Sequence, residues 1–179
     1  MSGVMSARYS RRARVLHWLS FVLVVAAYAS ITLRKLFERG CEQRLLALES
    51  HFMFGIAVLL VALPRLLSRL GENAPPMDPP PPLWMLLSGW LSHGLLYAFL
   101  IVQPLLGIVA RLAEGRGIGV PLSERVIPSF FGAHQRLAGL AESAHVWLGE
   151  AFYWVIGLHI LAALFHLLVR RDNVVRRMT

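Results

Sequence analysis

Seven histidines are the residues of this sequence best suited to chemistry, because imidazole nitrogens bind metals and exchange protons near neutral pH. They are His17, His51, His93, His134, His145, His159 and His166. All except His134 lie in, or at the edge of, long apolar segments. An ionisable side chain in such a segment is costly, so each is a candidate functional residue. The alternative is that a histidine only hydrogen-bonds to a neighbouring helix and serves packing.

The spacing on the last apolar segment is informative. His145 and His159 are 14 residues apart, which is nearly four helical turns and places them on one face, about 21 Å apart along the axis. His166 follows on much the same face. One helix therefore presents an imidazole near each surface of a membrane.

Four apolar segments position these histidines. The chain has 179 residues, of which 56% are hydrophobic and only 16% charged, and this composition excludes a disordered chain and an ordinary soluble protein. A span needs roughly 20 apolar residues, and the segments run near 15–33, 48–70, 88–110 and 144–169. Residues 83–90 could instead lie along the membrane surface. We expect an all-α integral membrane protein, an antiparallel four-helix bundle forming one domain over 1–179.

The second segment carries Pro64, Arg65 and Arg69 in its last turns. Proline there can kink the helix without breaking it, and arginine can extend to the lipid headgroups. The proline-rich stretch at 75–82 that follows predicts a stiff, extended loop with no site of its own.

The formal charge of +8 is distributed as a membrane topology signal and does not resemble a nucleic-acid footprint. Arginines gather before the first span and after the last: Arg8, Arg11, Arg12, Arg14, Arg170, Arg171, Arg176 and Arg177. Four spans place both termini on one side, and these arginines predict that side to be the cytoplasm. We expect a multi-pass protein of the bacterial inner membrane. The arginine-rich start also resembles a cleaved signal peptide, but cleavage would discard His17.

Depth pairs the histidines across the bundle. The first span rises from the inside and the second descends from the outside, which places His17 near the inner surface and His51 near the outer. His51 then faces His145 on the outer side. On the inner side, His17 pairs with His159 or His166, and His93 is a further inner candidate. The spacing leaves the inner pair open.

Two b-type haems with two histidine ligands each require a pair of facing imidazoles near each membrane surface. Both axial positions of the iron are then filled, which favours electron transfer over oxygen activation. Gly55 and Gly149 each lie one turn after an outer histidine and could make room for a porphyrin, although glycine in ordinary helix packing is an equal alternative. A zinc or copper site would need three or four ligands at one depth. The single Cys41 excludes a cysteine-based zinc site, an iron–sulfur cluster and an internal disulfide.

Several motifs together carry a family resemblance over nearly the whole chain. They are Tyr9-Ser10 with Leu16-His17-Trp18, His51 with Gly55, Ser92-His93-Gly94, Val155-Ile156-Gly157-Leu158-His159 with Ala162-Ala163, and Arg171-Asp172-Asn173. With these motifs the chain resembles the bacterial cytochrome b561 family, and within it the four-helix superoxide oxidases.

The resemblance implies two haems b in the bundle, with His17 and His159 as iron ligands of the inner haem and His51 and His145 as those of the outer. His93 and His166 would then lie close to a haem or to a quinone. It further implies superoxide oxidation at the outer face and ubiquinone as the electron acceptor at the inner face. The outer loop around 120–140 and the stretch 144–147 match the superoxide oxidases less well, and no role follows for His134.

The expected partners are membrane lipid, quinone and superoxide, and we expect no nucleic acid. Charged residues could attract or serve some of these partners. Basic residues that could focus a small anion on the outer side are Arg34, Lys35, Arg39, Arg44, Arg116, Arg125 and Arg136. Glutamates on the same side weaken this effect. At the inner end, His166 could donate protons to a quinone. One alternative function is the cytochrome b subunit of a larger dehydrogenase or hydrogenase, and another is a cofactor-free transporter or scaffold.

Overall fold

The computed structural model describes residues 8–130 and 132–179. Its long helices are α1 (Arg11–Arg34), α2 (Glu42–Gly71), α3 (Leu83–Ala113) and α4 (Gln135–Phe165), and α4 continues into a π-helical turn, η1 (His166–Arg170). In the described residues, four helices are long and apolar enough to cross a membrane. The prediction of a four-helix membrane protein is thereby confirmed.

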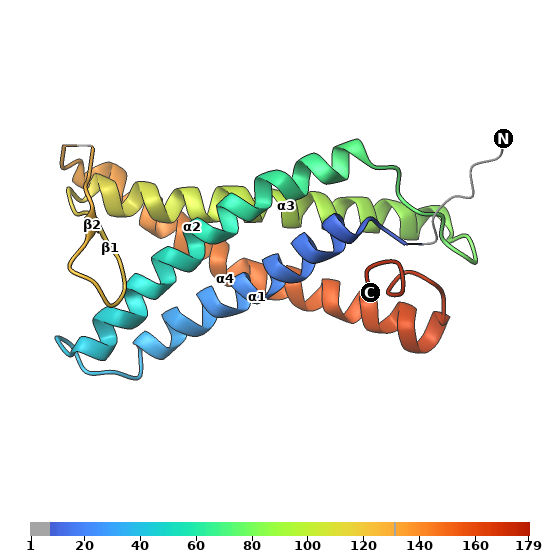
Figure 1. The fold of residues 1–179 in the computed structure, drawn as a ribbon, viewed down its shortest axis with the longest axis horizontal. Helices are drawn as coiled ribbons and strands as arrows, with labels where there is room; N and C mark the ends of the chain where they lie inside the picture. The colour runs from blue at the N-terminus through green and yellow to red at the C-terminus, as the bar shows by residue number, and fades with distance from the viewer. Residues whose placement is uncertain (1–7, 131) are drawn as a thin grey trace.

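The helices pack as two neighbouring pairs. α1 lies along α2, α3 lies along α4, and α2 contacts α3. The start of α1 and the C-terminus lie at one end of the bundle, together with the loop between α2 and α3 (Figure 1). We call this the terminal end and the opposite end the hairpin end.

The hairpin end carries a short antiparallel strand pair that was not predicted (Figure 1). β1 (Ile118–Gly119) and β2 (Val126–Ile127) pair with Ile118 opposite Ile127. Two residues per strand are too few to give a recognisable alternation of polar and apolar residues, so the sequence contains no periodic signal for them.

Local sequence explains where the helices begin and end. The Ser10 hydroxyl accepts a hydrogen bond from the Ala13 N–H at 3.1 Å, which caps α1. α3 starts directly after Pro82, as proline favours a helix start and cannot continue one. Residues 83–90 are therefore the first turns of α3 and do not form a separate surface segment. At the other end of the chain, Arg171 adopts a left-handed conformation with φ 54° and ends η1.

The bundle is apolar outside and closely packed where helices meet. Large side chains such as Leu67 and Trp154 are exposed, as expected for a lipid-facing surface. The buried cluster Val58, Ala62 and Leu100 joins α2 to α3. Small residues at such contacts let the helices approach closely, as is usual in membrane bundles.

Candidate functional site

At the hairpin end, two imidazoles face one another from different helices. His51 on α2 and His145 on α4 have ring centroids 6.0 Å apart and ring planes inclined at 83°. The Nδ1 of His51 lies 2.8 Å from the Ala27 carbonyl oxygen, and the Nδ1 of His145 lies 2.9 Å from that of Gln103. A carbonyl oxygen can only accept, so Nδ1 carries the proton in both rings. The nitrogen left with a free lone pair is Nε2 in each case.

The two histidines of this pair are spaced to hold one haem iron between them. A metal–imidazole bond is about 2 Å long, so a centroid separation of 6.0 Å leaves room for one metal ion between the rings. Metal-bound histidines usually donate the other ring N–H to a carbonyl or carboxylate, which fixes the ring orientation. Both rings here already make that hydrogen bond.

Contacts between α3 and α4 hold His145 in place. The Gln103 amide donates to the His145 carbonyl oxygen at 2.9 Å, in addition to accepting from the imidazole through its own carbonyl. A Cβ at Gly107 would lie 2.9 Å from Cε1 of His145, so only glycine leaves the ring its space. Neither Gln103 nor Gly107 was predicted from the sequence as a site residue, although an amide inside an apolar span was an available signal.

The two glycines proposed to make room for a porphyrin differ. A Cβ at Gly55, one turn after His51, would meet no atom within 4 Å, so space beside this histidine remains open to a flat ring. A Cβ at Gly149 would lie 3.0 Å from the Gln103 amide nitrogen. The Gly149 carbonyl also accepts a hydrogen bond from the Tyr28 hydroxyl at 2.7 Å. Close helix packing therefore accounts for Gly149.

At the terminal end, three histidines and an arginine form a second cluster. His93 on α3 and His159 on α4 have ring centroids 5.5 Å apart, and the Nδ1 of His93 donates to the Gly89 carbonyl oxygen at 2.7 Å. Nη2 of Arg65 donates to the Nδ1 of His17 at 2.9 Å. The ring in direct contact with His159 is thus His93, and the direct polar partner of His17 is Arg65.

Arg65 does not extend to the lipid headgroups as predicted. Its guanidinium turns into the bundle, where its Cζ lies 5.2 Å from the centre of the Tyr97 ring. The ring face of Tyr97 and the lone pair of His17 together stabilise the cation there. Arg69, one turn later, is exposed as expected.

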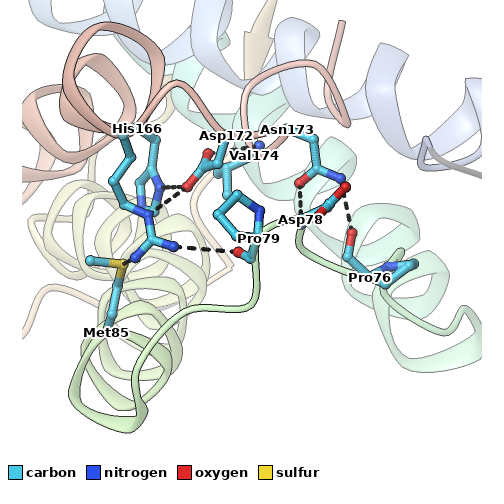
Figure 2. Close-up of polar contacts among 9 residues, drawn as sticks. Pro76, Asp78, Pro79, Met85, His166, Asp172, Asn173 and Val174 are labelled. Atoms are coloured by element: carbon cyan, nitrogen blue, oxygen red, sulfur yellow. Dashed lines mark hydrogen bonds and ion pairs between the residues drawn. The ribbon is translucent and has the colours of Figure 1, made fainter.

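His166 belongs to a third group, formed where the C-terminal tail folds back on the bundle (Figure 2). Its Nδ1 lies 2.6 Å from Oδ2 of Asp172. Nε of Arg170 lies 3.0 Å from the same oxygen, and its Nη2 donates to the Pro79 carbonyl at 3.3 Å. Asn173 donates to the Pro76 carbonyl at 3.1 Å. The proline loop is a loop as predicted, and its carbonyls also dock the tail.

Asp172 is almost fully buried in this group, with 1% of its side chain exposed. Burial alone raises its pKa, but the hydrogen bonds from His166 and Val174 and the charge of Arg170 outweigh it and hold the pKa below the usual value. Because the folded pKa is depressed, the carboxylate stabilises the fold above its unfolded pKa. That contribution is lost as the pH falls through the folded pKa.

We expect Asp172→Asn to destabilise the protein at pH 7 by about 3 kcal/mol, because it leaves Arg170 without its carboxylate partner. The measurement is thermal unfolding in detergent as a function of pH. The difference from the wild type should begin to shrink below about pH 4, the usual pKa of an aspartate, and disappear as the pH falls through the lower folded pKa. Asp78→Asn is the matched control, since Asp78 is exposed and takes part through its backbone N–H. A pH-independent difference would contradict the role of the Asp172 charge.

Basic residues at the hairpin end are unequally engaged. Arg116 pairs with Glu114, N to O 3.8 Å, and Arg44 donates to the carbonyls of Arg34 and Phe37. Nε of Arg34 is buried and has no hydrogen-bond partner among the described residues. Arg34 also lies close enough to His51 for its charge to act there. Of the seven basic residues predicted to attract an anion, Arg34 is the one whose charge acts on a histidine of the pair.

Comparison with known proteins decides the family. The model of the family described as "Prokaryotic cytochrome b561" matches residues 8–179. The chain belongs to this family. It is 32% identical over 174 residues to "Cytochrome b561 homolog 1" of Escherichia coli (strain K12), which covers 96% of each chain. It is also 32% identical over 179 residues to "Probable superoxide oxidase CybB" of Yersinia pestis, which covers 97% of each.

Family membership confirms the resemblance drawn from the histidine motifs. Cytochromes b561 are membrane proteins that carry haem b and transfer electrons. This chain is therefore a multi-pass bacterial membrane protein that functions in electron transfer. The cofactor-free transporter or scaffold finds no support here, because the family implies haem b. The number of haems and the assignment of ligands remain predictions.

Proposed function

We propose that the chain is a di-haem cytochrome b of the bacterial inner membrane that oxidises superoxide at one face and reduces ubiquinone at the other. Both termini lie in the cytoplasm in this proposal, so the hairpin end is the outer end. The observation that carries it is the His51–His145 pair, with ring centroids 6.0 Å apart and both Nδ1 atoms bonded to carbonyls.

Four histidines hold the two irons in this proposal. His51 and His145 are the ligands at the outer end. For the inner end we propose His17 and His159, as the family resemblance indicates, with His93 as the competing ligand because it contacts His159. Haem supplies one-electron chemistry when bound, and two histidines per iron leave no open coordination position, which suits electron transfer.

At the outer end, the residues attract an anion. Superoxide carries one negative charge, and the positive charge of Arg34 acts on His51, while its Nε has no hydrogen-bond partner among the described residues. Fixed positive charge at the mouth of a low-dielectric site raises the local concentration of anions. The name of the Yersinia pestis relative agrees with this substrate.

At the inner end, we assign proton transfer to a histidine. Reduction of a quinone consumes two electrons and two protons, so it needs a titratable group with access to water. Asp172 fixes the proton of His166 on Nδ1 and leaves Nε2 to exchange protons with a quinone. His166 is the residue we assign to this proton transfer.

One observation favours a second function, the cytochrome b subunit of a larger dehydrogenase or hydrogenase. Two large apolar side chains near the hairpin, Leu122 and Phe130, are 89% and 79% exposed although they lie outside the helices. Large apolar side chains exposed outside the membrane spans can belong to a protein-docking surface. A partner protein bound there would replace superoxide as the electron donor.

A superoxide pulse separates the two functions. Superoxide is mixed with the oxidised, purified protein in detergent, and the haem absorbance is followed in time with and without ubiquinone. We expect haem reduction faster than spontaneous dismutation, followed by reoxidation only when ubiquinone is present. If dithionite reduces the haems but superoxide does so no faster than it dismutates, the superoxide activity is wrong and the subunit function is favoured.

A further inference from the structure

We propose that Arg65 and the cleft beside it bind a carboxylate, namely a propionate side chain of the haem at the terminal end. This inference rests on the proposed function. It assigns a cofactor-positioning role to a residue for which the sequence alone suggested only contact with lipid.

Arg65 is a cation inside the bundle without an acidic partner. It lies six residues before the end of α2, or about 9 Å along the helix axis. Its contacts include the Nδ1 of His17 at 2.9 Å and the side chain of Tyr97. Among residues 8–130 and 132–179, no carboxylate forms an ion pair with it. A positive charge at membrane depth normally has an anionic or carbonyl partner.

The cleft next to Arg65 presents more donors than acceptors. Arg65, Ser68, Arg69 and Tyr97 line it. Ser68 is only 8% exposed, and its hydroxyl has no hydrogen-bond partner among the described residues. The acid in the lining, Glu72, already accepts a hydrogen bond from the Ser10 hydroxyl at 2.7 Å. The guanidinium of Arg65 and a free buried hydroxyl are groups that recognise a carboxylate.

The proton on His17 links this cleft to the cofactor. Arg65 can only donate, so its hydrogen bond requires a lone pair on the Nδ1 of His17 and places the ring proton on Nε2. A histidine that binds iron through Nε2 carries its proton on Nδ1 instead. Arg65 and an iron at Nε2 therefore exclude each other as partners of His17. When His17 serves as a ligand, the guanidinium needs a new acceptor, and a carboxylate of the same cofactor supplies one.

Position distinguishes this carboxylate from a lipid phosphate. Arg65 turns inward between His17 and Tyr97, whereas Arg69 is exposed on the same helix. The exposed arginine is the one placed for headgroups. Arg65 is placed for a group that enters the bundle beside His17.

The test measures how firmly the terminal-end haem is held in Arg65→Gln and Arg65→Lys. Holoprotein in detergent is mixed with excess apomyoglobin, and haem transfer is followed by absorbance. In Arg65→Gln, we expect one of the two haems to transfer about tenfold faster, since a charge-assisted hydrogen bond is lost, and its midpoint potential to fall because a positive charge is removed. Arg65→Lys should restore most of the potential and part of the retention. Arg11→Gln, which alters an exposed arginine at the same end, should match the wild type.

A second measurement needs no substitution and covers a variant that fails to fold. The full wild-type chain, produced without haem, is supplied with haem b or with its dimethyl ester, in which both carboxylates are blocked. We expect weaker retention of the ester at the terminal end.

The outcomes separate this inference from the proposed function. Unchanged transfer and potential in Arg65→Gln, or equal retention of haem b and the ester, overturns the carboxylate site while the two-haem proposal stands. An effect of Arg65→Gln that appears only in nanodiscs with anionic phospholipid identifies a lipid phosphate instead and also overturns it. A wild-type chain that holds no haem at the terminal end removes the proposed function itself.

Discussion

Replacing His145 by alanine is expected to remove one haem and leave the other, so that haem b per chain falls by about half. The ring of His145 lies 6.0 Å from that of His51. No other histidine ring pairs with His51 in the described residues, so none can take its place. The measurement is the pyridine haemochrome assay per mole of purified chain. His51→Ala should have the same effect, and the double variant should lose no more than either single variant, since both residues act on one iron.

The matched control is His134→Ala. His134 precedes the same helix and is exposed, so its removal should leave the haem content unchanged. Full haem content in both His145→Ala and His51→Ala would contradict the pairing at the hairpin end. Loss of all haem together with loss of the folded, monodisperse protein would show that the pair holds the bundle as well as the cofactor.

Replacing His17 by alanine is expected to abolish superoxide-driven reduction of ubiquinone while the hairpin-end haem is still reduced by superoxide. The reason is that His17 would hold the inner haem, which would supply the electron path from the outer haem to ubiquinone. His159→Ala should behave in the same way. The measurement combines the haem count with the superoxide pulse in the presence and absence of ubiquinone.

His93→Ala is the decisive comparison for the inner ligands. The ring of His93 contacts that of His159, with centroids 5.5 Å apart, yet we propose His17 as the iron ligand and assign no iron to His93. The His93→Ala variant should therefore retain both haems. If His93→Ala loses a haem and His17→Ala keeps both, the inner ligands are His93 and His159, and the Arg65–His17 hydrogen bond persists in the loaded protein.

The fold was predictable because a bilayer imposes a strong constraint on composition. The four spans were found from apolar length alone, but the helices extend beyond them. α4 begins at Gln135 and α3 at Leu83, well before the predicted spans at 144 and 88. The first turns of α4 contain polar residues that continue the helical hydrogen bonding outside the hydrocarbon core, so hydropathy marks the span and not the helix. The first turn of α3 is apolar, and its start is set by Pro82.

The histidine pair at the hairpin end was also predictable, because depth follows from residue spacing and span direction. Which way a side chain turns around its helix does not follow so directly. Arg65 turns inward because Tyr97 on another helix offers it a ring face, and His166 bonds to Asp172 because the chain reverses at Arg171. Both depend on contacts between distant parts of the chain, which a single sequence read by spacing does not contain.

The central claim is that four imidazoles of one chain hold two haems. Its most direct test is the pyridine haemochrome content of the purified wild-type chain, combined with electron paramagnetic resonance of the oxidised protein. We expect two haems b per chain, both low-spin because each iron would have two histidine ligands. A single haem per chain, or a high-spin iron with an open coordination position, would contradict it.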